Sequence, residues 1–129
     1  MPRKPNETFT DKELEIMKVV WELGEGGVKD IQNRLLGARH YNSVLTIIRV
    51  LEQKGHLTHR EKGRNHIYRP TENQKTSRGR ILNHLVNQVF GGSASSMVIN
   101  LVETGDLSRR DLDEIRRRVS SSEKDREKE

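Results

Sequence analysis

The sequence contains no cysteine, few aromatic residues and no long apolar run. With no thiol in 129 residues, disulfides, thiolate metal sites and a cysteine nucleophile are all excluded. One Trp, two Tyr and two Phe leave any core to be built mainly from Leu, Ile and Val. No run of about 18 apolar residues is present, and the first residues lack the apolar stretch of a signal peptide. We therefore expect a cytoplasmic protein without membrane insertion.

Charge, by contrast, is abundant and unevenly placed. Charged residues make up 33% of the chain, and the net charge is +5. This whole excess falls between residues 39 and 69, where seven Lys/Arg stand against two acids and four His are also present. Such a segment predicts a surface that faces a polyanion.

The first part of the chain predicts three short helices and a hairpin. After an N-terminal arm over residues 1–9, Thr10 begins a helix with a capping box to Glu13, and this helix stops at Gly24. A second helix ends at Gly37, and a third ends at Gly55. Two strand-like segments follow, over residues 57–62 and 66–69, and a short turn at residues 63–65 joins them.

The rest of the chain predicts three amphipathic helices and a tail. The first of these helices stops at the glycine pair 91–92, Ser93 caps the second, and Ser108 opens the third. These helices place residues 71–119 in one helical region. The last ten residues, 120–129, have no apolar side chain and are predicted to be a disordered charged tail.

The third predicted helix, about 42–54, has two opposite faces, and Asn42 or its neighbour is expected to cap it. On a helical wheel its apolar side carries Val44, Ile47, Ile48 and Leu51. The opposite side carries short polar groups that can form directional hydrogen bonds with base edges or phosphates. Leu45 and Val50 flank this polar side, and each has two readings: contact with a thymine methyl group, or a place at the margin of the packed face.

Three helices followed by a basic hairpin are the order of a winged helix-turn-helix. In that fold the third helix enters the major groove, and the hairpin, or wing (here about 57–69), lies along the backbone or minor groove. The sequence thus predicts a mostly α fold with a small β-hairpin, in which residues 10–70 form the DNA-binding domain. Tyr41 has two readings, a phosphate contact through its hydroxyl or pure packing. The predicted DNA contacts are Arg39, Tyr41, Asn42, Ser43, Thr46, Arg49, Arg60, Lys62 and Arg64.

The chain resembles the penicillinase-repressor family, which includes β-lactamase, methicillin-resistance and copper-responsive repressors. The matching segments are LEIMKVVWELGEGGVKDI, YNSVLTIIRVLEQKGHL, REKGRNHIYRP and FGGSASSMVINLVETGDLSRRDLDEIRRRV. The resemblance implies a homodimeric transcriptional repressor that binds an inverted-repeat DNA operator and dimerises through a C-terminal helical region, residues 71–119. The apolar stripe at residues 81–90 also favours pairing with a second chain. The predicted dimer contacts are Leu82, Leu85, Val86, Val89, Phe90, Val98, Leu101, Leu112 and Ile115.

The resemblance also bears on regulation. Copper-responsive relatives use a C-terminal cysteine motif that this chain lacks, which excludes metal sensing of that kind. In β-lactamase-type relatives, proteolysis in the helix after the GGS segment relieves repression, and the matching bond here is Asn100–Leu101. A membrane sensor metalloprotease, or a protease that it activates, is the partner this implies. The match is partial, because those relatives carry Phe after the Asn, and the alternative reading is that Leu101 belongs only to the dimer core.

Other functions have less support in the sequence. The five histidines are scattered, no acid or third ligand stands near them at metal spacing, and no phosphate-binding glycine loop is present. We therefore expect no enzymatic activity, no catalytic residue, no metal and no cofactor. A winged helix that binds protein or RNA is the alternative, and it predicts a hydrophobic or acidic face on the third helix, which this chain lacks.

Overall fold

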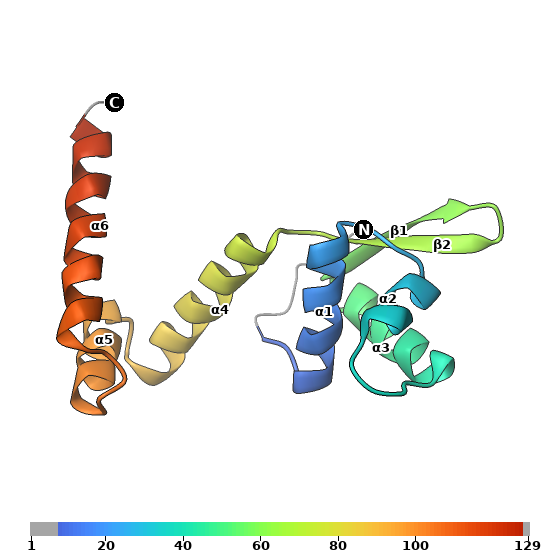
Figure 1. Cartoon of the computed structure of the whole chain (residues 1–129), viewed down its shortest axis with the longest axis horizontal. Helices are drawn as coiled ribbons and strands as arrows, with labels where there is room; N and C mark the ends of the chain where they lie inside the picture. Colours follow the sequence, from blue (N-terminus) through green and yellow to red (C-terminus); the bar gives the residue numbers. More distant parts are fainter. Residues whose placement is uncertain (1–7, 128–129) are drawn as a thin grey trace. The chain divides into compact units, whose positions relative to one another are not determined.

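The computed structural model describes residues 8–127, which divide into one compact unit up to His84 and a second from Leu85 onward (Figure 1). Most of the predicted N-terminal arm, residues 1–7, lies outside the described residues. The first unit contains α1 (Asp11–Leu23), α2 (Val28–Arg34), α3 (Tyr41–Gln53), β1 (Leu57–Lys62) and β2 (Asn65–Pro70). Beyond the hairpin lie α4 (Gln74–Val89), α5 (Ala94–Glu103) and α6 (Arg109–Glu127). This is the predicted architecture, a winged helix-turn-helix followed by helices.

The start of α1 confirms the predicted capping box. The backbone N–H of Glu13 donates to the Thr10 hydroxyl at 3.2 Å, and the Thr10 N–H donates to the Glu13 carboxylate at 2.8 Å. The helix ends at Gly24, whose φ of +82° favours a residue without a side chain. Local sequence alone thus determines both ends of this helix.

The core of the first unit is formed by one face of each helix together with the base of the hairpin. Ile16 and Val20 from α1, Ile31 from α2 and Ile48 from α3 are at most 2% exposed. Leu57 and Tyr68 close the core from the hairpin, and Trp21 packs against its edge. The Trp21 indole N–H donates to the Glu72 carbonyl at 3.0 Å, which attaches the segment before α4 to α1.

The boundaries of α2 and α3 differ from the predicted ones. α2 ends at Arg34 because Leu35 already has an extended backbone, so the helix stops before Gly37. α3 begins at Tyr41 and has His40 as its N-cap residue, since the His40 carbonyl accepts the first helical hydrogen bond from Val44 at 3.1 Å. Asn42 therefore lies inside the helix and does not cap it.

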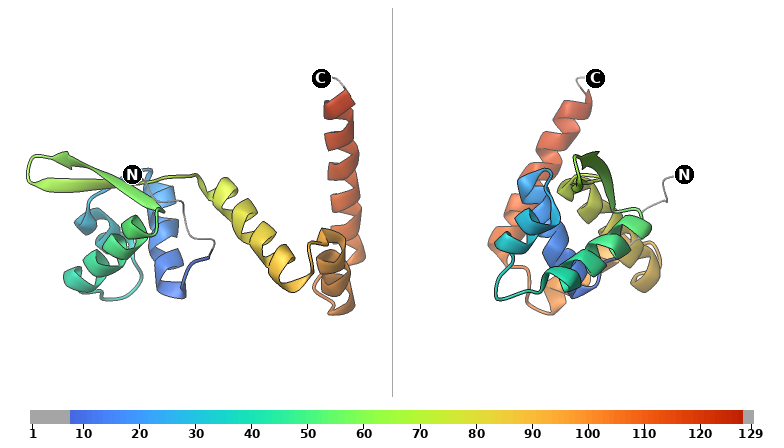
Figure 2. Two further views of the ribbon diagram at one scale, coloured as in Figure 1. Left: turned by 180° about the vertical axis from the view of Figure 1, so that it is seen from behind. Right: turned by 90° about the vertical axis from the view of Figure 1, so that its right-hand side faces the viewer.

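The hairpin is antiparallel, and its register runs from Leu57 opposite Pro70 to Lys62 opposite Asn65. Only residues 63 and 64 form the turn, and Gly63 has a φ of +63°, as the first position of a type II′ turn requires. The turn is therefore shorter than the predicted 63–65. It projects beyond the three helices of this unit (Figure 2).

The helices after the hairpin begin where the sequence predicts. The Ser93 hydroxyl accepts the Ser96 N–H at 3.1 Å, and the Ser108 hydroxyl accepts the Asp111 N–H at 3.1 Å. α6 continues to Glu127, where the sequence predicts a disordered tail; residues 128–129 lie outside the described residues. Glu, Lys and Arg have high helix propensity, so a segment without apolar side chains can extend a helix that is already formed.

Within residues 8–127, no single helix is long and apolar enough to cross a membrane. α4 and α5 reach the required length and composition only when they are taken together across their bend.

Candidate nucleic-acid interface

α3 has one buried face and one exposed face, as its sequence predicts. Its apolar side, which includes Val44 and Ile48, packs into the core against α1 and α2. The Thr46 hydroxyl donates to the Asn42 carbonyl at 2.8 Å, which leaves its lone pairs free to accept. The opposite side is solvent exposed and presents the predicted DNA-contact residues Asn42, Ser43, Thr46 and Arg49.

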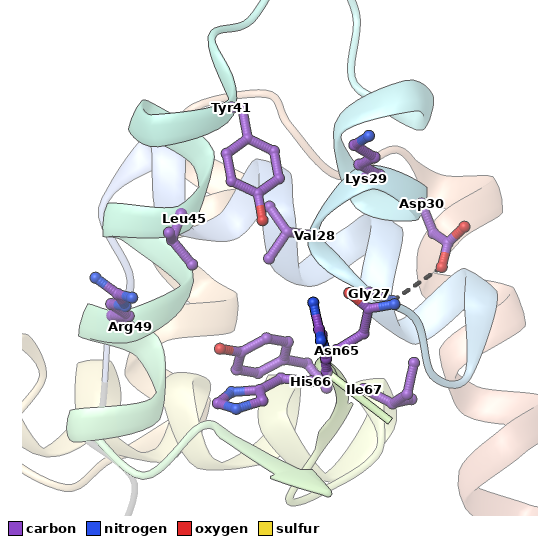
Figure 3. Close-up of a pocket in the computed structure, with 12 residues that line it drawn as sticks. Gly27, Val28, Lys29, Asp30, Tyr41, Leu45, Arg49, Asn65, His66 and Ile67 are labelled. Carbon is purple, nitrogen blue, oxygen red and sulfur yellow. Dashed lines mark hydrogen bonds between the residues drawn. The ribbon is translucent and has the colours of Figure 1, made fainter. Parts of the chain in front are cut away.

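A cleft of about 540 Å³ lies between α3, the start of α2 and strand β2 (Figure 3). α3 contributes Tyr41, Leu45 and Arg49, which are four residues apart and therefore follow one side of the helix. Val28 from α2 and His66 from β2 form the facing walls. The other lining residues are Gly27, Lys29, Asp30, Arg64, Asn65, Ile67 and Tyr68. The cleft thus joins the exposed helix to the wing.

Arg39 is held within the protein. Its guanidinium contacts the Glu15 carboxylate at 2.5 Å and donates to the Leu36 carbonyl at 3.3 Å. The Arg39 carbonyl in turn accepts a hydrogen bond from Gln32 at 2.7 Å. These contacts tie the turn between α2 and α3 to α1, and they favour a structural role for Arg39 over the predicted DNA contact.

The other predicted DNA-contact cations differ in exposure and in whether they form an ion pair within the chain. Arg60 contacts Glu25 at 2.9 Å, and both side chains remain about half exposed, so water weakens this pair. Arg49, Lys62 and Arg64 are exposed and have no ion-pair partner within residues 8–127. Three unpaired cations are therefore divided between α3 and the distal half of the wing.

Lys54 also contributes to the basic segment, but its ammonium is turned inward. It contacts both carboxylate oxygens of Glu13, at 2.8 and 3.0 Å, and Glu13 is only 3% exposed. Burial by itself would raise the pKa of Glu13, but hydrogen bonds from Lys54 and Thr10 outweigh it and lower the pKa. The pair fixes the C-terminal end of α3 to α1.

The two faces of the wing carry different chemistry, because neighbouring residues of a strand point to opposite sides. Arg60 and Lys62 share one face, as the sequence predicts from their spacing, and Arg69 joins them because it is opposite Thr58. The other face carries His59 opposite Tyr68. It is turned toward α3, since Tyr68 is buried in the core.

On that second face, His59 and His66 stack with ring centroids 4.2 Å apart and planes 4° from parallel. Glu52 of α3 contacts His59 through Nδ1. The histidines are scattered along the sequence, which does not by itself indicate this pair. The two-residue turn contained the signal, because the resulting register makes residues 59 and 66 diagonal neighbours across the strands.

Most of the predicted dimer contacts lie on exposed surface. Of the ten exposed large hydrophobic side chains in the described part of the chain, eight are on α4, α5 and α6. Val86 differs, since it is 7% exposed and already packed within the chain, and Phe90, Val98 and Leu101 are half-buried. The eight exposed residues are Leu82, Leu85, Val89, Ile99, Val102, Leu112, Ile115 and Val119. Ile99, Val102 and Val119 are not among the predicted contacts.

Within residues 8–127, no group of three or more His, Asp and Glu side chains is arranged to hold a metal ion. The site itself presents cations, hydrogen-bonding side chains and an apolar edge on one exposed helix and its neighbouring hairpin.

Comparison with known proteins identifies the family. The penicillinase repressor family model matches residues 9–121. The penicillinase repressor of Bacillus licheniformis is 27% identical over 123 residues, which cover 94% of this chain and 95% of that protein. The methicillin resistance regulatory protein MecI of Mammaliicoccus sciuri is 24% identical, and that of Staphylococcus aureus strain N315 is 23% identical; each alignment covers 86% of this chain and 94% of the relative. The chain therefore belongs to the penicillinase repressor family.

Proposed function

We propose that this protein is a DNA-binding transcriptional repressor that acts as a homodimer on an inverted-repeat operator. The observation that carries the proposal is the cleft, where the exposed polar side of α3 meets the wing and where Arg49 and Arg64 have no acidic partner among the described residues. Membership of a family named for a repressor supports the same function. The polyanion implied by the basic segment is thus double-stranded DNA.

In this proposal α3 is the recognition helix. Its 13 residues span about 20 Å along the helix axis. An α-helix is about 10–12 Å across with its side chains, so it fits the major groove, which is about 12 Å wide. Arg49 reads a guanine through its two parallel N–H groups, and Asn42 pairs with an adenine. Tyr41 places its exposed edge at the cleft, where its hydroxyl contacts a phosphate. Lys62 and Arg64 hold the wing against the backbone.

Arg49→Ala is expected to weaken binding to a selected operator by roughly 1 to 3 kcal/mol and to relax base preference at one position per half-site. The reason is that Arg49 is exposed on the polar side of α3 and has no ion-pair partner in the described part of the chain. Operators are first selected from random duplexes, and dissociation constants are then measured on the selected site and on random DNA.

Lys62→Ala serves as the matched control, because it removes one cation from the wing. It should weaken binding to both DNAs and reduce the slope of log K against log salt by about 0.9. If Arg49→Ala lowered the affinity for both DNAs equally, Arg49 would be a phosphate contact and α3 would not read sequence through it.

Dimerisation follows from the exposed apolar side chains of α4, α5 and α6. On α5 and α6, the side chains of Ile99, Val102, Leu112, Ile115 and Val119 remain exposed in the single chain. A second copy removes this surface from water, and its two-fold axis matches a palindromic operator. Half-sites are then about 10 base pairs apart, or a multiple of that distance.

Proteolysis at Asn100–Leu101 relieves repression in this proposal, with a membrane sensor metalloprotease, or a protease that it activates, as the partner. The bond lies within α5, where Asn100 is exposed and Leu101 is half-buried. Cutting there separates α6 and the last three residues of α5 from the DNA-binding unit. The basis is the family resemblance of the segment around this bond.

A chain truncated after Asn100 reproduces the product of this cleavage. We expect it to be monomeric and its affinity for a two-half-site operator to fall by about 100-fold or more, because the linkage between two DNA-binding units is lost. Sedimentation and operator titration measure the two effects. A truncated chain that dimerised and bound like the full chain would rule out relief by cleavage at this bond.

A further inference from the structure

Leu45 is the apolar member of the cleft-facing side of α3. It lies between Tyr41 and Arg49, one helical turn from each, and all three line the cleft (Figure 3). Part of its side chain packs against the core, and the remainder is accessible. Along this side of α3, an apolar side chain thus lies between the hydroxyl of Tyr41 and the guanidinium of Arg49.

The position of Leu45 is fixed by its neighbours in the helix. Val44 is 2% exposed and Ile48 is 0% exposed, so the backbone on both sides of Leu45 is anchored in the core. Leu45 therefore stays at the cleft when the helix is bound to a partner. Burying its accessible part against a polar base edge would leave that edge without a hydrogen-bond partner.

The major groove offers one base substituent that suits such a side chain. Guanine, cytosine and adenine present hydrogen-bond donors or acceptors there, whereas thymine also presents its C5-methyl group. Arg49 and Arg64 line the same cleft and have no ion-pair partner among residues 8–127, so their charge favours DNA as its occupant.

We infer that Leu45 is a specificity residue that contacts the methyl group of one thymine in each operator half-site. The inference rests on the proposed function and adds an apolar contact with thymine to the hydrogen bonds proposed for Arg49 and Asn42. Leu45 and Arg49 are four residues apart, about 6 Å along the helix axis. At about 3.4 Å per base pair, the thymine lies one or two base pairs from the guanine read by Arg49.

The test replaces each thymine of a selected operator by deoxyuracil, which removes only the methyl group. At one position per half-site, this change should weaken binding by the wild-type chain about 4-fold, the value of one buried methyl group. Leu45→Ala should bind the thymine and deoxyuracil operators equally. Leu45→Met, which keeps an apolar side chain of similar size, should retain the preference and shows that the effect is not one of folding.

If Leu45→Ala lowered the affinity for the thymine and deoxyuracil operators by the same factor, Leu45 would only pack, and the inference would be overturned. The same holds if no deoxyuracil change affected the wild-type chain while Arg49→Ala still altered base preference. That second result would leave the proposed function intact. A wild-type chain that bound no selected duplex better than random DNA would overturn both.

Discussion

Val89→Glu is expected to convert the proposed dimer into a monomer and to lower operator affinity by about 100-fold or more. Val89 lies at the end of α4 and is 61% exposed in the single chain. A carboxylate at this position would have to be buried without a partner in the interface, which costs several kcal/mol. Two linked DNA-binding units bind a two-half-site operator with an affinity about 100-fold or more above that of a single unit. Loss of the dimer therefore lowers the operator affinity. Sedimentation at micromolar concentration and titration with a two-half-site operator measure both effects.

Gln88→Glu is the matched control, since it places the same charge on the neighbouring exposed residue of α4. It should remain dimeric and bind like the wild type. Two results would contradict the assigned interface: a Val89→Glu chain that still dimerises, or monomers from both variants, which would mean that added charge alone separates the chains.

Acid is expected to destabilise the fold through His56, with a loss of about 2 kcal/mol between about pH 7.5 and pH 5. His56 is 1% exposed, its ring packs against Phe9, and its Nε2 has no hydrogen-bond partner in the described structure. Burial, with the positive charge of Arg80, lowers the pKa of His56 to about 4. Between about 4 and 6.5 the unfolded chain therefore binds a proton that the folded chain does not, and stability falls as pH falls through this range.

The measurement is urea denaturation at both pH values, at one protein concentration because dimerisation also affects stability. His56→Gln does not titrate and should lose most of the pH dependence. His40→Gln changes an exposed histidine and should retain it. A His56→Gln chain with the wild-type slope would assign the acid sensitivity to other groups.

Features encoded by neighbouring residues could be predicted from the sequence. The capping box between Thr10 and Glu13 and the two faces of α3 depend on residues within one or two helical turns, and the structure has both. The N-cap of α3, the end of α2 and the tail are local features that the prediction missed. Absence of apolar residues argued for disorder, but charged residues with high helix propensity extend α6 to Glu127.

Long-range pairing could not be predicted in the same way. Arg39, Lys54 and Arg60 were counted as one basic surface, yet their carboxylate partners lie 24, 41 and 35 residues away in the sequence. A charge count does not indicate which cations are neutralised by the fold. Likewise, the cleft requires side chains from α2, α3 and β2 to meet, which follows only from the tertiary arrangement.

The two-residue turn of the wing has a consequence for how this hairpin can vary. Successive residues of a strand point to opposite faces, so a shift by one residue moves every following side chain to the other face. Insertion of a single residue between Leu57, which is buried in the core, and His59 would move Arg60 and Lys62 to the face of the imidazoles and His59 to the opposite face. A wing that keeps its chemistry can therefore lengthen only by two residues at a time, or by a bulge that restores the alternation.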